Sequence, residues 1–186
     1  MVRLLAPVRI RGTFGKALSF DGVDDYVDCG NDESLDLFGE ITVAAWFRTT
    51  QDSVGSICLR KRYNYGTSPG FGLSINNDGQ VSFNLGDGTN RADACTTDAY
   101  NDGNWHYAVG VKDGSMVYIY IDGVLKGTDT DDVNITAYDC NLMIGQRGWG
   151  GNFFNGLIDE VRIYNRALSE EEIRRHFLGL QYLVRG

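Results

Sequence analysis

The sequence predicts an all-β protein: a two-sheet antiparallel β-sandwich of the jelly-roll type with a short C-terminal helix. Apolar residues alternate with polar ones at a period of two over most of the chain, as expected of half-buried strands. Six Asp-Gly pairs interrupt this alternation, and Asp-Gly tolerates the positive φ angles of tight hairpin turns. The chain has 24 glycines and only 2 prolines, which favours about a dozen short strands joined by tight turns.

The alternation is clearest in five segments, which we predict to be strands: 41–50, 70–75, 80–85, 105–111 and 116–121. Two of the Asp-Gly pairs, Asp78-Gly79 and Asp113-Gly114, are predicted hairpin tips. Trp46 follows the alternation of the first strand, so we expect it in the core.

One helix is predicted after the last strand, beginning at Ser169. Ser169 and Glu172 have the spacing of a capping box. Ile173 and Phe177 are four residues apart and would share one face of the helix. We expect this helix to cover the sandwich as a lid.

Size and composition exclude several classes of protein. A length of 186 residues favours one domain, which we predict to span residues 1–186. Hydrophobic residues make up 42% of the chain, which excludes a disordered chain, and no apolar run approaches the roughly 20 residues of a membrane-spanning helix. Acidic residues outnumber basic ones 25 to 17, the wrong balance for a protein that collects around phosphates. We therefore expect neither membrane insertion nor a nucleic-acid partner.

Four cysteines, Cys29, Cys58, Cys95 and Cys140, lack the C-x-x-C spacing of zinc and redox sites. Two alternatives stay open: two disulfides in an exported protein, or four buried thiols in a cytosolic one. If they are bonded, we expect Cys95 with Cys140 and Cys29 with Cys58, one of the three pairings that four cysteines allow. The N-terminal residues 1–12 lack the apolar core of a secretion signal, so an exported protein would be mature or excised from something longer.

Four segments in order carry a family resemblance: FGKALSFDGVDDYVDCG (14–30), ITVAAWFRT (41–49), DGNWHYAVGVKDGSMVYIYIDGVLKG (102–127) and LMIGQRGWGGNFFNGLIDEVRIYNRALSEEEI (142–173). The chain resembles the laminin-G-like, concanavalin-A-like jelly-roll superfamily, in particular the pentraxin-related LamG modules of bacterial, archaeal and viral surface proteins and glycosidases. The resemblance covers about residues 12–178, the expected core of the domain. It implies that the strand holding KALSF lies close to the strand holding IDEVRIY.

The resemblance also implies a structural Ca²⁺ where the first and last strands meet, with Asp21, Gly22 and Asp159 as ligands. Carboxylate and backbone oxygens from two strands distant in the chain would suit such a hard cation and would clip the ends of the domain together. The alternative is that Asp21 and Gly22 only form a turn and Asp159 caps a strand edge. The other acids of the first segment, Asp24, Asp25 and Asp28, are expected on the loop and solvent face.

A second acidic segment imitates a calcium-binding loop without completing it. Residues 129–139 place acids at positions 1, 3 and 4 of an EF-hand loop, but Val133 takes position 5 and Asn134 replaces the glycine of position 6. We expect a solvated loop here.

Catalysis is not expected. Glycoside hydrolases with a similar fold place two glutamates about an aspartate on one strand, and none of the six glutamates of this chain begins a Glu-x-Asp sequence. The chain has only two histidines, His106 and His176. Within the resemblance, Trp105 and His106 are a framework pair, so we expect His106 to be structural.

Two loops have the chemistry of a carbohydrate site. Residues 61–70 carry Tyr63 and Tyr65, and residues 145–154 carry Arg147 and Trp149 among glycines. Aromatic rings stack on the apolar faces of sugars, whereas guanidinium and amide groups bind hydroxyls. The alternative for Trp149 is that it folds back over the edge of the sandwich.

These observations predict a non-catalytic, lectin-like recognition module that binds carbohydrate or a glycoconjugate and is stabilised by Ca²⁺. Its partner would be a glycan or a glycosylated surface protein, and its place would be extracellular or at the cell surface, within a larger multidomain protein. The alternative is a structural or protein-adhesion domain without a sugar site. Exposure of Tyr63, Tyr65 and Trp149 would distinguish the two hypotheses.

Overall fold

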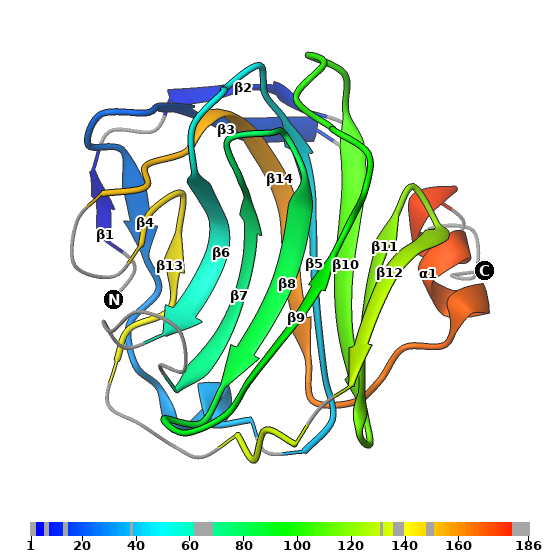
Figure 1. The fold of residues 1–186 in the computed structure, drawn as a ribbon. Coiled ribbons are helices and arrows are strands. Elements are labelled where there is room, and N and C mark those ends of the chain that lie inside the picture. The colour runs from blue at the N-terminus through cyan, green and yellow to red at the C-terminus, as the bar shows by residue number, and fades with distance from the viewer. Residues whose placement is uncertain are drawn as a thin grey trace, which may run out of the picture.

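Two seven-stranded sheets lie face to face (Figure 1). The computed structural model describes residues 3–5, 8–12, 15–37, 39–61, 69–130, 132–135, 140–147 and 151–179. Every described strand pairing is antiparallel. The predicted all-β sandwich is therefore confirmed, whereas the single domain over residues 1–186 stays a prediction.

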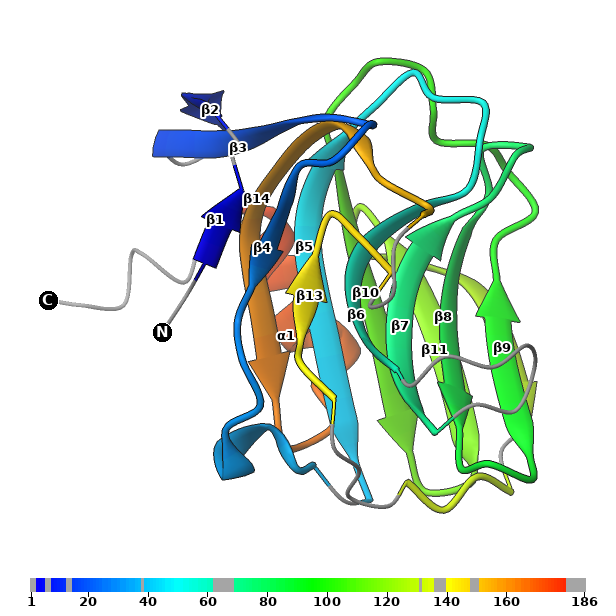
Figure 2. The same cartoon turned by 90° about the vertical axis from the view of Figure 1, so that its left-hand side faces the viewer.

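Figure 2 shows the first sheet in front of the second. The first sheet has the order β1 (Arg3–Leu5), β4 (Tyr26–Asp28), β13 (Met143–Ile144), β6 (Gly55–Lys61), β7 (Gly70–Ile75), β8 (Val81–Gly86) and β9 (Arg91–Cys95). The second has the order β12 (Val124–Thr130), β11 (Met116–Ile121), β10 (His106–Asp113), β5 (Ile41–Arg48), β14 (Asn155–Tyr164), β3 (Gly15–Asp21) and β2 (Val8–Gly12). A 3-10 turn, η1 (Glu33–Leu35), follows β4, and α1 (Glu170–Phe177) follows β14.

The predicted hairpins form where the Asp-Gly pairs stand. β7 and β8 pair through Ile75 and Val81, and Gly79 in the turn between them has φ 76°. β10 and β11 pair through Asp113 and Met116, and Gly114 has φ 56°. Both glycines adopt the left-handed conformation that these tight turns require.

The main core fills the space between the sheets. Successive side chains of a strand point to opposite faces, so alternate residues of β5, β7, β8 and β11 meet there. Its largest fully buried side chains are Phe20, Phe47, Phe71, Phe83, Phe154, Ile41, Ile57, Leu73, Ile75, Leu85, Ile119 and Ile121. On the other face of the β7–β8 pair lie polar residues such as Ser74 and Ser82, whose hydroxyls are 3.1 Å apart.

A second, smaller core lies under α1, on the outer face of the second sheet (Figure 1). The Ser169 side chain accepts a hydrogen bond from the Glu172 backbone N–H, and the Glu172 side chain accepts one from the Ser169 N–H, which completes the predicted capping box. Ile173 is fully buried, and Phe177 stacks on Trp46 with ring centroids 5.7 Å apart. The helix is thus the predicted lid, and Trp46 is buried beneath it rather than between the sheets.

The first and last strands of the resemblance lie side by side. β3 and β14 pair antiparallel, with Leu18 opposite Ile158 and Asp21 opposite Asn155. This confirms the expected adjacency of KALSF and IDEVRIY. Within the described residues, no helix is long and apolar enough to span a membrane.

The expectation of a solvated loop after Asp129 is wrong for the residues that the structure describes. β12 continues to Thr130, and Val133 and Ile135 are each only 4% exposed and belong to the main core. These two apolar side chains are separated by one residue, so both point inward while Asn134 stays exposed. Residues 131 and 136–139 lie outside the described part.

All four cysteines are free thiols, so neither expected disulfide forms. β13 lies between β4 and β6 and separates Cys29 from Cys58. Cys95 ends β9, and Cys140 precedes the start of β13; three strands, β6, β7 and β8, lie between β9 and β13. At ~4.8 Å per strand, this spacing exceeds the reach of a disulfide.

Candidate functional site

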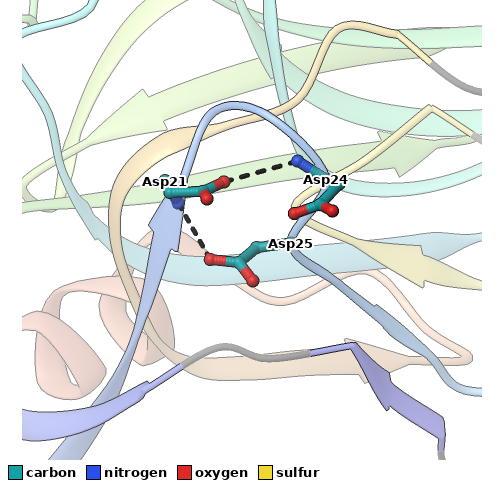
Figure 3. Close-up of side chains that lie close together, drawn as sticks. All are labelled: Asp21, Asp24 and Asp25. Carbon is teal, nitrogen blue, oxygen red and sulfur yellow. Dashed lines mark hydrogen bonds between the residues drawn. The ribbon is translucent and has the colours of Figure 1, made fainter.

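The loop between β3 and β4 gathers three carboxylates (Figure 3). Asp21 Oδ1 accepts hydrogen bonds from the backbone N–H of Val23 at 2.8 Å and of Asp24 at 3.4 Å. Gly22, at φ 79°, permits this tight turn. Asp25 Oδ2 in turn accepts from the Asp21 N–H at 3.0 Å. One carboxylate oxygen each of Asp21, Asp24 and Asp25 lies within 4.8 Å of the others.

The three carboxylates differ in their surroundings. The N–H of Val23 lowers the pKa of Asp21, which is exposed. Burial raises the pKa of Asp25, which is only 7% exposed, and the negative charges of Asp21 and Asp24 raise it further. A buried carboxylate between two like charges is unfavourable unless it takes up a proton or a cation. The chemistry of this donor set fits a hard cation such as Ca²⁺.

Asp159 does not join this group. Asp21 pairs with Asn155, and Asp159 lies four residues further along β14, which corresponds to about 13 Å of extended strand. Its Oδ1 accepts from the Glu160 N–H at 2.9 Å, and its Oδ2 lies against Gly12. The structure therefore brings Asp21 together with Asp24 and Asp25, which were expected to line only the loop and solvent face, rather than with Asp159.

Gln146 lies at the same end of the β4–β13 pair as Asp25. Ile144 on β13 pairs with Val27 on β4, and the two strands are antiparallel. Gln146, two residues after Ile144, and Asp25, two residues before Val27, therefore lie at the same end. Gln146 is 7% exposed, and its Oε1 accepts no hydrogen bond within the described residues. It is a further oxygen donor at this end of the sandwich that the sequence interpretation missed.

His106 has the structural role that the sequence predicts. Its Nδ1 lies 2.8 Å from Asp122 Oδ2, and its Nε2 lies 3.1 Å from Asp102 Oδ1. Burial lowers the pKa of His106, but the hydrogen bonds to the two carboxylates outweigh that effect and raise it above its ordinary value. The ring ties the loop before β10 to the β11–β12 turn.

The predicted carbohydrate-binding residues are described only in part. Tyr63, Tyr65 and Trp149 lie outside the described residues. Arg147 is half-buried, and its backbone N–H donates to the Gly151 carbonyl at 3.4 Å. The expectation for these loops stays a prediction.

An open pocket of about 300 Å³ lies beside the acidic loop. Its lining comes from three places: Arg48, Thr49 and Thr50 at the end of β5, Gly103 before β10, and Asn155, Gly156 and Leu157 at the start of β14. The pairing of Asn155 with Asp21 connects the pocket to the acidic loop.

Gly156, which lines this pocket, allows a close approach of β14 to β5. A Cβ on Gly156 would lie 2.2 Å from the Arg48 carbonyl oxygen, so a larger residue would force the two strands apart. The Thr49 hydroxyl donates to the Asn155 carbonyl and accepts from the Gln51 N–H, which fixes the ends of β5 and β14 to each other. The pocket is therefore built on two rigid strands of the second sheet.

The rim of the pocket carries polar side chains with unused hydrogen-bonding capacity. Arg48 Nε donates to the Gly103 carbonyl at 2.6 Å, while its terminal nitrogens have no partner within the described residues. The side chains of Thr50 and Asn155 are exposed and also make no hydrogen bond within the part of the chain that the structure describes. A pocket with a few convergent polar groups has the general form of a small-ligand site. Strand alternation alone could not have indicated it, because its members come from three separate segments.

The sequence matches one family model over residues 21–174, that of the concanavalin A-like lectin/glucanases superfamily. No curated protein matches it.

Among solved structures, domain 4 of AbnA, an extracellular GH43 arabinanase from Geobacillus stearothermophilus determined in complex with arabinotriose, is similar at a TM-score of 0.73 and 23% identity. That comparison covers 91% of this chain and 80% of that one. The binding domain of Paraclostridial Mosquitocidal Protein 1 is similar at a TM-score of 0.77 and 15% identity over 97% of this chain and 47% of that one. The binding domain of botulinum neurotoxin DC, determined in complex with SialylT, is similar at a TM-score of 0.71 and 15% identity, covering 98% and 47%. This chain thus spans about half the length of the toxin domains, and the likeness to all three shows the fold.

Proposed function

Since the chain belongs to the concanavalin A-like lectin/glucanase superfamily, we propose that it is a non-catalytic recognition module that binds carbohydrate. The superfamily includes both lectins and glucanases, so membership alone does not separate binding from catalysis. The fold resembles binding domains rather than catalytic ones. The six glutamates also lack the Glu-x-Asp spacing of the related glycosidases.

The observation that carries this proposal is the family match over residues 21–174, which covers most of the chain. Two similar domains were determined in complexes, one with arabinotriose and one with SialylT. The open pocket between β5 and β14 supports the proposal, because it could hold a sugar. A surface-facing recognition module would act outside the cell or at its surface, within a larger protein.

A glycan array with the purified protein tests the proposal. We expect binding to a restricted set of glycans, with the strongest signals confirmed in solution by calorimetry. A blank array would contradict carbohydrate binding and would favour the structural or protein-adhesion domain.

We also propose that the β3–β4 loop holds a structural Ca²⁺. The carboxylates of Asp21, Asp24 and Asp25 would bind the ion, with the Gly22 carbonyl and Gln146 Oε1 as further oxygen donors. The close grouping of three carboxylates, one of them buried, supports this proposal. Bound Ca²⁺ would neutralise the repulsion among them and tie the end of β3 to the start of β4.

Thermal unfolding of chelator-treated protein tests the calcium proposal. Millimolar Ca²⁺ should raise the melting temperature by several degrees, because an ion present at about 100 times its Kd adds ~2.7 kcal/mol to the stability of the folded state. The Asp25→Asn variant should lose this shift. In chelator, its melting temperature should be no lower than that of the wild type, since the substitution removes a buried charge from between two others.

The matched control for this experiment is Asp78→Asn, at the exposed tip of the β7–β8 hairpin, which should keep the full calcium shift. A wild type that does not respond to Ca²⁺, or an Asp25→Asn variant that responds as the wild type does, would contradict the calcium proposal.

A further inference from the structure

We propose that the pocket between β5 and β14 binds a carboxylate-bearing sugar residue, with Arg48 as the partner of the carboxylate. This inference rests on the proposed carbohydrate-binding function and deepens it, because it names the class of sugar and the residue that selects it. The shared chemistry is that of a sugar acid, whether a uronic acid or a sialic acid.

The guanidinium of Arg48 is held in place while its binding edge is left open. Its Nε donates to the Gly103 carbonyl at 2.6 Å, which fixes the plane of the group against the loop before β10. Both terminal nitrogens are without a partner within the described residues, although the side chain lines a pocket. A planar guanidinium with a free edge matches the two oxygens of a carboxylate.

The charge of the pocket favours an anion. The protein has a formal charge of -8, yet Arg48 is the one charged residue among the described residues that line this pocket. Asp102, which precedes the lining residue Gly103, is engaged elsewhere, since it accepts from the Asn104 N–H and from the Asn104 amide and lies 3.1 Å from His106 Nε2. Ca²⁺ in the β3–β4 loop would further reduce the negative potential beside Asn155.

The remaining lining suits the hydroxyls and the ring of one sugar. The Asn155 amide offers both a donor and an acceptor, and the Thr50 hydroxyl offers either. Leu157 is the apolar side chain among the residues that line the pocket. A volume of about 300 Å³ lies at the lower limit of ligand pockets, which indicates a single sugar unit rather than a long chain.

Pairs of sugars that differ in the carboxylate test this proposal. Binding would be measured by NMR titration of the ¹⁵N-labelled protein with methyl galacturonide against methyl galactoside, and with sialyllactose against lactose. We expect at least one acid to bind about tenfold or more tightly than its neutral counterpart, with shift changes at the amides of Thr50, Gly103 and Gly156. The two pairs distinguish a uronic acid from a sialic acid.

Two variants of Arg48 distinguish the contribution of its positive charge to acid binding from that of its planar guanidinium group. Arg48→Gln should abolish the preference for the acid, and Arg48→Lys should retain only part of it, because an ammonium group cannot form the paired hydrogen bonds. Arg174→Gln is the matched control, since Arg174 is exposed on α1 and its substitution removes the same charge from another surface. Thr50→Val leaves the Arg48–Gly103 hydrogen bond intact and should weaken the acid and the neutral sugar alike.

The outcomes separate this proposal from the one on which it rests. If the glycan array is blank, carbohydrate binding fails and the pocket assignment fails with it. If the array shows binding, but acids and neutral sugars bind equally or Arg48→Gln keeps the wild-type preference, only the pocket assignment is overturned. NMR shift changes confined to residues away from the pocket would also overturn the pocket assignment. This readout uses the wild-type protein, so it still applies if an Arg48 variant does not fold.

Discussion

At the scale of single residues, His106 is the ionisable group whose environment the fold defines most closely. It lies between Asp102 and Asp122, and its side chain is 13% exposed. The backbone N–H of Asn104 and then His106 lower the pKa of Asp102 to about 2. The ion pair thus joins the loop before β10 to the β11–β12 turn.

The stability of the protein should depend on pH through His106. Because its folded-state pKa lies above that of the unfolded chain, its contribution of about 1 kcal/mol is complete below pH ~6.5 and is lost as the pH rises through the folded-state pKa. The measurement is the free energy of unfolding in urea between pH 5 and 8. His106→Gln should flatten this part of the profile.

Because His176 also titrates, the effect of His106 is obtained as the difference between the stability profiles of the wild type and of His106→Gln. Burial lowers the pKa of His176, so its contribution has the opposite sign and is present in both proteins. Subtracting the His106→Gln profile from that of the wild type therefore isolates His106. Two parallel profiles would show that the ion pair adds nothing to stability.

The sequence predicted the structural role of His106 but not the grouping of acids in the β3–β4 loop. The strand position of His106 beside Trp105 was sufficient, because a histidine in a strand usually packs against its neighbours. Asp24 and Asp25 were expected on the loop and solvent face, whereas the Asx turn at Asp21 folds Asp25 back to accept from the Asp21 N–H. Such a turn depends on atomic geometry that the spacing of acids does not reveal.

At the scale of elements, α1 shows how local and tertiary signals agree. The capping box at Ser169 and Glu172 starts the helix, and Arg166 forms a further ion pair with Glu172. Ile173 and Phe177 then bury the apolar face of the helix against Trp46. The capping box and the shared face of Ile173 and Phe177 were readable from the sequence, because these signals are local and periodic.

Loss of the helix cap should have a measurable cost. Ser169→Ala removes the acceptor of the Glu172 backbone N–H and should lower the free energy of unfolding by about 1 kcal/mol. Urea unfolding measures this loss, and Ser115→Ala at the exposed β10–β11 turn is the control that should leave stability unchanged. A loss equal to that of the control would mean that packing of Ile173 and Phe177 alone holds the helix.

At the scale of the whole molecule, the sequence predicted the two layers of strands but not which distant segments of the chain meet at their ends. The alternation placed strands correctly, and the resemblance joined β3 to β14. The pocket, by contrast, forms where the ends of β5 and β14 meet a loop that follows β9, and no local pattern connects these segments. Strand order also keeps the four cysteines apart, and no local pattern in the sequence indicates that order.

Spacing between the two sheets depends on a glycine that the sequence does not single out. Gly110 on β10 faces Phe83 on β8, in the opposite sheet, and a Cβ at this position would lie 2.1 Å from Phe83 Cγ. Gly110→Ala should therefore destabilise the protein by about 1–3 kcal/mol, because the ring or the sheets must move. Phe83→Leu in the same chain should recover part of this loss, so the double variant should be more stable than the sum of the single effects predicts. Urea unfolding of the four proteins gives the coupling energy, and strict additivity would show that the Gly110–Phe83 contact does not limit the distance between the sheets.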